Sequence, residues 1–484
     1  MKVTRTLATA VLVLTLVGLA SAQTWAPLTH QPGVTLGPML QLRDGRILVH
    51  EEQSGNGSAW HILTPDVMGS YANGTWSSGG NLPAGYAPFY FGSQVLLNGK
   101  QVAVEGGEYN NGTAVWTTLG AIGNVTPWGP VHWVANTPPA GWTTIGDAQS
   151  VILANGKYLQ ANCCTRQSAF FVRPNTWTMN GLIAGTDNDE QAYTLLPTGK
   201  VLSVEAWATS CFGNNGSELF NPTTNTWACA AATPTQLWDN AGHELGPATL
   251  MYTGKVFQVG ATNHTAVYNP TTNTWAAGPT PANGLTGYDA PAALLPNGKV
   301  LEMLGPGAFA AGCQMELYNP ATNTLANTAN PLNCPSDPTF VGHFMLLPTG
   351  QVMFTDFSNR VELYTPTPGV VASAVPRITS TVHTFTHGSR NNLLSVTNLN
   401  GLSQGASYGD DYQPDTDYPL VRLKSLTTGK VTYAFTHDES THSIASGTRG
   451  TTKFDLPTTL APGQYNLFVV ANGIPSAAFP VTIN

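Results

Sequence analysis

A short turn motif recurs seven times along this 484-residue chain and restricts the possible folds more than any other feature. Each copy has apolar residues, a turn that ends in glycine, a basic residue or glutamine, and more apolar residues. The copies read LRDGRILV, LLNGKQVAV, LANGKYLQA, LPTGKVLSV, MYTGKVFQV, LPNGKVLEM and LPTGQVMFT. Such turns are typical of β-hairpins, because the tight turn needs a positive φ that glycine adopts without steric cost. The motif predicts seven hairpins with turn glycines Gly45, Gly99, Gly156, Gly199, Gly254, Gly298 and Gly350.

A second motif follows the hairpins. NPTTNTW occurs at residues 221–227 and again at 269–275, and NPATNTL occurs at 319–325. Identity at a fixed period indicates a copied structural unit. We interpret this motif as the turn of a second hairpin, whose Trp packs between neighbouring units. Two hairpins per repeat make a four-stranded antiparallel sheet, and seven such sheets around an axis make a seven-bladed β-propeller over residues 23–366.

The last repeat lacks a Trp strand, because the chain changes character after RVELYTPTPG. The segment QTWAPL near the N-terminus matches the phase of NTWAAGP in an earlier repeat. We therefore expect the N-terminal strand to complete blade seven. A strand from the opposite end of the chain would close the ring without an exposed sheet edge.

The C-terminal part carries no glycine-turn repeat. Residues 367–376 resemble a linker, and residues 377–484 contain alternating strand patterns such as YPLVRLKS, KVTYAFT and QYNLFVVA. This pattern predicts an immunoglobulin-like β-sandwich of about seven strands. The whole chain is thus expected to be all-β.

The first 22 residues have the features of a secretory signal peptide. Lys2 and Arg5 precede an apolar stretch, and Ala20-Ser21-Ala22 is typical of a cleavage site. We expect a secreted protein, cut near Ala22, without a transmembrane anchor. Residues 1–22 contain two basic and no acidic residues, so their removal changes the formal net charge from −8 to −10. This acidic balance disfavours a nucleic-acid partner.

Six cysteines in an exported protein favour disulfide bonds. Proximity in sequence favours the pairs Cys211–Cys229 and Cys313–Cys334, each within one repeat. The adjacent Cys163 and Cys164 are left either free or joined in a strained vicinal ring.

The C-terminal sequences GLSQGASYGDDYQPDTDYPLVRL and PGQYNLFVVANGIPSAAFPVTI resemble the early-set domain of the galactose oxidase and glyoxal oxidase family. The repeats resemble the kelch-like blades of that family, and Gly106-Gly107 keeps the kelch double glycine in one blade. The resemblance implies a secreted propeller followed by an early-set sandwich.

That family uses a copper-radical site built from a cysteine cross-linked to a tyrosine, a Tyr-His pair and a histidine of the sandwich. Tyr90 matches the tyrosine position, but Leu36 stands at the cysteine position and Phe340-Val341 at the Tyr-His pair. His343 lies two residues further on. In the sandwich, His437 is the better candidate and His442 the weaker one. Without the cysteine and the second tyrosine, copper-radical oxidation is not expected.

Acidic residues occupy the corresponding position, eight residues before the turn, in other blades. These are Asp147, Glu190 and Asp289, with Glu244 next to the position in blade five. With Tyr90 they should converge at one mouth of the propeller, together with Trp207 and Tyr288 as flat apolar surfaces. Tyr90, Glu244, Trp207, Tyr288 and His437 are the predicted binding residues.

Three interpretations of the acidic mouth remain open. The carboxylates of Asp147, Glu190 and Asp289 could be solvated in a water-filled channel, could bind a hard cation such as calcium, or could act with Tyr90 as catalytic groups. The sequence favours a non-catalytic, monomeric propeller that binds a glycan, a cell-wall component or a protein. The alternative is an enzyme acting on carbohydrates, either a hydrolase or lyase or a divergent oxidase.

Overall fold

The computed structural model describes residues 23–52, 57–409 and 411–484, so the predicted signal peptide lies outside the described residues. The described chain is all-β, with 41 strands and only three short 3₁₀ turns, η1 (Ala282–Gly284), η2 (Thr339–Val341) and η3 (Ala372–Ala374). Nowhere in these ranges is there a helix long and apolar enough to cross a membrane.

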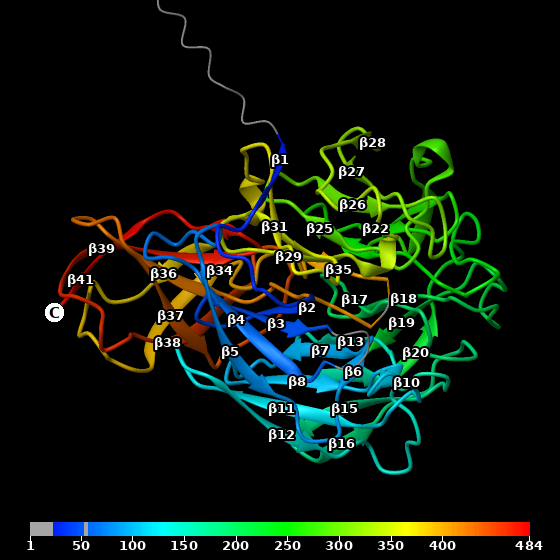
Figure 1. Cartoon of the computed structure of the whole chain (residues 1–484), viewed down its shortest axis with the longest axis horizontal. Helices are drawn as coiled ribbons and strands as arrows, with labels where there is room; N and C mark the ends of the chain where they lie inside the picture. Colours follow the sequence, from blue (N-terminus) through cyan, green and yellow to red (C-terminus); the bar gives the residue numbers. More distant parts are fainter. Residues whose placement is uncertain (1–22, 53–56, 410) are drawn as a thin grey trace, which may run out of the picture.

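Antiparallel four-stranded units make up most of the structure (Figure 1). The first three units are β2 (Leu36–Gln41), β3 (Ile47–Glu51), β4 (Ala59–Thr64) and β5 (Thr75–Asn81); β7 (Gly92–Val95), β8 (Gln101–Glu105), β11 (Gly120–Val125) and β12 (Val131–Asn136); and β13 (Ser150–Ile152), β14 (Tyr158–Ala161), β15 (Ser168–Arg173) and β16 (Thr176–Met179). A small sheet of β6 (Pro88–Phe89), β9 (Tyr109–Asn110) and β10 (Thr113–Ala114) lies beside the second unit in sequence.

The next three units follow the same order. They are β17 (Thr194–Leu195), β18 (Val201–Val204), β19 (Ser217–Asn221) and β20 (Thr226–Cys229); β21 (Ala248–Leu250), β22 (Val256–Val259), β23 (Thr265–Asn269) and β24 (Thr274–Ala277); and β25 (Ala292–Leu294), β26 (Val300–Leu304), β27 (Gln314–Asn319) and β28 (Thr324–Asn327). The final unit combines β29 (His343–Leu346), β30 (Val352–Thr355) and β31 (Glu362–Thr365) with β1 (Thr24–Pro27), which pairs antiparallel with β31.

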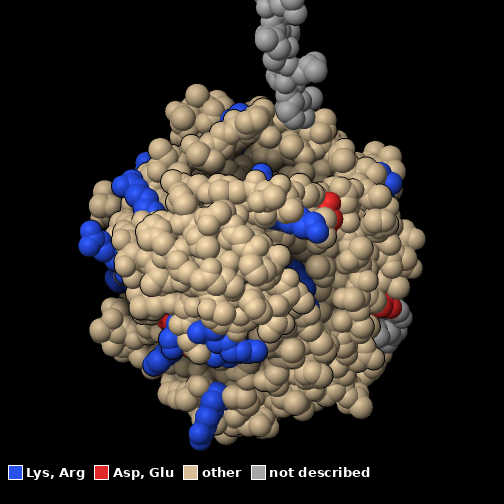
Figure 2. Space-filling view, turned by 90° about the vertical axis from the view of Figure 1, so that its left-hand side faces the viewer, with Lys and Arg blue, Asp and Glu red and all other residues tan. Residues whose placement is uncertain are grey.

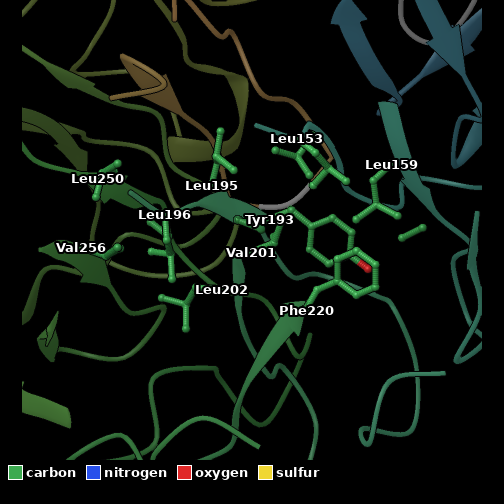
Figure 3. Close-up of a cluster of buried hydrophobic side chains, with 14 of the residues drawn as sticks. Leu153, Leu159, Tyr193, Leu195, Leu196, Val201, Leu202, Phe220, Leu250 and Val256 are labelled. Atoms are coloured by element: carbon green, nitrogen blue, oxygen red, sulfur yellow. The ribbon is translucent and has the colours of Figure 1, made fainter. Parts of the chain in front are cut away.

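The units form a closed ring. Their first strands contact one another in the cyclic order β2, β7, β13, β17, β21, β25, β29 and again β2. A ring of four-stranded antiparallel sheets is the arrangement of a β-propeller. The apolar core lies between adjacent sheets. In one cluster, shown in Figure 3, Leu159 of β14, Leu195 of β17 and Val256 of β22 belong to three successive units.

The predicted turn chemistry is confirmed. All seven turn glycines have positive φ, between 69° and 87°. The two NPTTNTW copies form the turns between β19 and β20 and between β23 and β24. In each copy the first Asn side chain accepts a hydrogen bond at 3.0 Å from the backbone N–H two residues later, which stabilises the turn locally.

Tryptophans on the outer strands connect neighbouring units. Five indole N–H groups donate hydrogen bonds to the preceding unit or to the residues directly after it. The bonds run from Trp25 to Ala329, Trp76 to His30, Trp133 to Gly79, Trp177 to Thr137 and Trp275 to Ser217, at 2.7–3.1 Å. These Trp side chains therefore join neighbouring sheets.

Both cysteine pairs predicted from proximity are confirmed as disulfides, Cys211–Cys229 and Cys313–Cys334. Cys163 and Cys164 are not bonded to either pair.

The C-terminal strands form a second hydrogen-bonded array, to the left in Figure 1. Its strands are β32 (Arg377–Ser380), β33 (Thr384–Phe385), β34 (Asn392–Thr397), β36 (Leu420–Ser425), β37 (Val431–His437), β38 (Arg449–Asp455), β39 (Gly463–Ala471), β40 (Ile474–Pro475) and β41 (Phe479–Ile483). All pairings are antiparallel except that of β33 with β41. These strands enclose their own core, which includes Leu394, Leu423 and Leu467.

The described residues of the segment between β34 and β36, 398–409 and 411–419, leave this array and enter the ring. We call it the axial insertion. Within it, β35 (Ala406–Ser407) pairs with β25, Ser403 donates to the backbone of Leu250 in β21, and Tyr412 forms a bridge with Ser93 in β7. These contacts reach first strands in several parts of the ring, so the insertion fills its centre.

Candidate functional site

A pocket of about 290 Å³ lies where the segments that lead into the first strands come together. Every residue that lines it is either acidic or aromatic. The lining residues are Phe89, Tyr90, Glu108, Tyr109, Asp147, Glu190, Glu244, Asp289, Phe309, Phe340 and Tyr408. No Lys or Arg is among them, so the negative charge is not balanced by a basic side chain within this lining.

The acidic residues predicted from the repeat do come together here. Asp147, Glu190 and Asp289 all line the pocket, and so do Tyr90 and Glu244. Carboxylate oxygens of Glu190, Glu244 and Asp289 lie within 4.8 Å of one another. A second group with the same spacing contains Asp147, Asp189 and Glu190, so Glu190 belongs to both.

The backbone at these positions adopts an unusual conformation. Tyr90, Glu190 and Asp289 have φ values of 49°, 61° and 39°. This left-handed region is costly for residues with a Cβ atom, and such residues concentrate at binding and catalytic sites. The segments before β7, β17 and β25 thus each present a residue with this conformation to the same pocket.

Glu244 is positioned by a tight loop. The Asp239 carboxylate accepts hydrogen bonds from the backbone N–H groups of Ala241, Gly242 and Glu244. The Glu244 side chain points beside Tyr288, and only 9% of the residue is exposed. Its Oε2 atom is buried without a hydrogen-bond partner among the described residues. A buried carboxylate oxygen without a donor is costly and is a natural cation ligand.

The negative charge of the pocket contributes to the raised pKa of two of its tyrosines, Tyr90 and Tyr109. Burial, followed by the charges of Asp289 and Glu108, raises the pKa of Tyr90 well above its ordinary value. The neighbouring Glu108 raises the pKa of Tyr109. Both phenols therefore stay protonated at neutral pH and can donate hydrogen bonds.

Aromatic rings form two walls. On one wall, the ring centroids of Phe89 lie 3.9 Å from Tyr90 and 5.9 Å from Tyr109. On the other, Phe309 lies 5.5 Å from Phe340 and 5.5 Å from Tyr288. Phe309 is 68% exposed and so stands at the rim, where a ligand would meet it first.

Tyr408 comes from the axial insertion and was not predicted. Its hydroxyl donates to the backbone oxygen of Phe340 at 2.7 Å, and its ring stacks on His343 with centroids 5.3 Å apart. Burial lowers the pKa of His343 to about 3, so this imidazole is neutral. The pocket is thus completed by a residue that belongs to the C-terminal part of the chain. Asp189 and Phe309 were missed too, because they lie off the repeat position used for prediction.

Three predicted binding residues do not line the pocket. Trp207 stacks on His243 with centroids 3.5 Å apart, and Tyr288 is buried behind Glu244 and Phe309. His437 lies in β37, where it contacts Asp438 and Asp455. At the positions compared with the copper site, Leu36 is fully buried and Phe340 contributes a wall of the pocket.

Comparisons with known proteins gave structural matches alone. No family model matches the chain, and no curated protein matches it. A streptogramin B lyase structure matches at 13% identity and a TM-score of 0.47, covering 71% of this chain and 97% of that one. A selenomethionine-substituted virginiamycin B lyase from Staphylococcus aureus matches at 11% identity and a TM-score of 0.47, covering 71% and 98%.

Proposed function

We propose that this chain is a secreted, non-catalytic binding protein whose acidic pocket holds a divalent cation, calcium, as part of a site for a sugar ligand. The proposal includes its architecture, a seven-bladed propeller followed by an immunoglobulin-like early-set sandwich, as in the galactose oxidase family. The cyclic order of the seven first strands supports the seven blades, and the separate core of the C-terminal strands supports a second domain.

One observation carries the cation site. Glu190, Glu244 and Asp289 bring carboxylate oxygens within 4.8 Å of one another, around a buried oxygen of Glu244 that has no donor among the described residues. Calcium binds six to eight oxygens at about 2.3–2.6 Å, so oxygens on opposite sides of the ion are separated by about this spacing. Copper would favour nitrogen and sulfur donors, and the residues lining this pocket include neither His nor Cys.

The aromatic walls support a sugar as the remaining ligand. Sugar hydroxyls can complete the coordination of a calcium ion, and the apolar face of a sugar ring can pack on Tyr90, Phe309 or Phe340. The pocket volume of about 290 Å³ admits one or two sugar rings at most. The ligand is therefore expected to be a chain end or a single residue.

Thermal unfolding of the purified protein tests the cation site. Calcium should raise the melting temperature, because a ligand at one hundred times its Kd stabilises the folded state by about 2.7 kcal/mol. The double variant Glu190→Gln, Asp289→Asn should lose this response and should be more stable than the wild type without calcium, since two repelling charges are removed.

The matched control is Asp187→Asn, which removes a charge from the same loop outside both carboxylate groups. It should keep the calcium response. If calcium, magnesium and manganese all leave the wild type unchanged, the cation site is wrong. In a separate experiment, a glycan array probed with and without calcium identifies the sugar. Sugar binding of equal strength with and without calcium would show that sugar recognition does not depend on the cation.

A further inference from the structure

Two adjacent cysteines lie next to the acidic pocket, outside both disulfides. Cys163 is buried and Cys164 is exposed, yet their Sγ atoms are only 2.6 Å apart. The backbone holds them in place, since Cys163 N–H donates to Ile145 at 2.9 Å and Cys164 N–H donates to Asn188 at 3.3 Å. Cys164 has a φ of 62°, the left-handed conformation. The sulfur contact is thus fixed by the fold around the pair.

The pair is connected to the pocket through one carboxylate. The Cys163 thiol donates a hydrogen bond to Asp189 Oδ1 at 3.3 Å. Asp189 in turn has a carboxylate oxygen within 4.8 Å of carboxylate oxygens of Asp147 and Glu190, and both of these residues line the pocket. A change at the sulfur of Cys163 therefore alters the hydrogen bonding of one carboxylate in this group.

The geometry points to a reversible vicinal disulfide between Cys163 and Cys164 that adjusts the cation affinity of the acidic pocket through Asp189. The coupling rests on the proposed cation site, whereas formation of the disulfide does not. Adjacent Cα atoms are about 3.8 Å apart, below the usual disulfide range of about 4.4–6.8 Å. The ring is therefore strained and should be reduced more easily than the other two disulfides.

The exchange can proceed with an external disulfide as oxidant. The exposed Cys164 thiolate attacks one sulfur of the external disulfide, and the other half leaves as a thiolate. The Cys163 sulfur then attacks the Cys164 sulfur, its proton passes to Asp189 and on to water, and the second thiolate leaves. The two cysteines lose two electrons, and the external disulfide is reduced to two thiols.

Oxidation changes what Asp189 contacts. In the dithiol form the Cys163 S–H group donates to Asp189, whose carboxylate lies beside the proposed ligand Glu190, and this hydrogen bond weakens the attraction of Asp189 for a cation held there. The disulfide has no S–H group, so the full negative charge of Asp189 then acts on the cation. Because one hydrogen bond to Asp189 is lost, calcium affinity should rise about threefold to fivefold on oxidation.

Peptide mapping of the unreduced, full-length secreted protein tests the ring. The peptide with Cys163 and Cys164 should resist alkylation after denaturation and should have the mass of a disulfide, about 2 Da below the dithiol. A mild thiol should then open this ring while Cys211–Cys229 and Cys313–Cys334 stay closed. Alkylation of both cysteines in unreduced protein, or their pairing with other cysteines, would overturn the ring.

Calcium titration calorimetry of two variants tests the coupling. Cys164→Ala keeps the Cys163 thiol on Asp189, so it should bind calcium like the reduced wild type under all conditions. Cys163→Ala removes that donor and should bind like the oxidised protein, also independently of redox state. Equal affinities for both variants would overturn the coupling.

The two proposals fail in distinguishable ways. Absence of calcium binding in every form would overturn the cation site and the coupling together, while the mapping would still decide the ring. Calcium binding with the same affinity in the reduced and oxidised wild type would overturn the coupling alone.

Discussion

At the residue scale, the candidate site depends on a few side chains held in costly conformations. Tyr90, Glu190 and Asp289 lie in the segments before β7, β17 and β25, and each has positive φ. The stability of the surrounding ring therefore has to offset two unfavourable contributions, the strained backbone and the repulsion between carboxylates. The two NPTTNTW copies, by contrast, contain residues whose role is structural.

The two NPTTNTW tryptophans offer a matched test of such a role. The Trp275 indole donates to Ser217 Oγ at 3.1 Å, whereas the Trp227 indole N–H has no partner among the described residues. Trp275→Phe should therefore reduce the free energy of unfolding by about 1 kcal/mol more than Trp227→Phe. Urea unfolding of both variants measures the difference. Equal losses would show that the bond between the sheets contributes nothing.

The site residues could be predicted only where they follow the repeat. Asp147, Glu190 and Asp289 occupy one offset from the turn glycines, and sheets that are copies of one unit place the same offset at the same height. Trp207 and His437 were assigned without such an offset, and neither lines the pocket. Asp189 lies one residue before the repeat offset, and Phe309 lies in the loop between β26 and β27, so the offset did not indicate them.

At the element scale, each sheet is built from two hairpins with strong local turn signals. These signals made the strands predictable, because glycine and asparagine turns act within a few residues. The axial insertion could not be predicted in this way. Its strand β35 pairs Ala406 with Ala293, more than a hundred residues away, and no local sequence pattern indicates that contact.

The N-terminal strand is the element whose removal has the clearest consequence. Trp25 of β1 packs on Tyr364 and Phe354 with centroids 5.2 Å and 5.5 Å apart. Deleting residues 23–33 should lower the free energy of unfolding by at least about 3 kcal/mol, because it removes the partly buried Trp25 together with the buried Leu28. The melting temperature of the deletion variant measures this.

The control is Thr24→Ala, at an exposed position of the same strand. It should leave the melting temperature nearly unchanged. A deletion variant that melts with the intact protein would mean that β1 does not close the ring.

At the scale of the whole molecule, the acidic residues are turned inward. At least seventeen of the 27 Asp and Glu residues are buried, whereas the only buried Lys or Arg residues in the described ranges are Arg43 and Arg46. On the face drawn in Figure 2, the side of the C-terminal strands, Lys and Arg are widespread and few acids are visible. The negative net charge therefore describes the interior more than this surface.

This burial predicts how stability depends on pH. Glu302 lies opposite Glu316 in the pairing of β26 and β27, and burial, then the charge of Glu316, raises the pKa of Glu302 well above its ordinary value of 4.5. The folded state thus binds this proton more tightly than the unfolded state. Stability contributed here is present below pH 4.5 and is lost as pH rises toward the folded pKa.

Glu302→Gln should remove that loss. At pH 8 the variant should gain about 1–3 kcal/mol in free energy of unfolding, the usual cost of a buried polar group without a partner. Urea unfolding from pH 5 to pH 8 should also show a weaker pH dependence than in the wild type. A variant less stable than the wild type at pH 8 would contradict this account.

Asp438 provides the opposite control. Burial raises the pKa of Asp438, but the hydrogen bond to His437 and the charge of Lys100 lower it overall. Its contribution is therefore present at neutral pH and is lost as pH falls through the folded pKa. Asp438→Asn should slightly destabilise the protein at pH 8, where Glu302→Gln stabilises it.

The central claim is that the acidic pocket holds a cation, and anomalous diffraction tests it most directly. Crystals grown with calcium should be measured at a long wavelength where calcium scatters anomalously. The account predicts one strong peak about 2.3–2.6 Å from carboxylate oxygens of Glu190, Glu244 and Asp289, and none there in crystals of the Glu190→Gln, Asp289→Asn variant. A wild-type map without a peak among these three carboxylates, at calcium concentrations that saturate any measured binding, would contradict it.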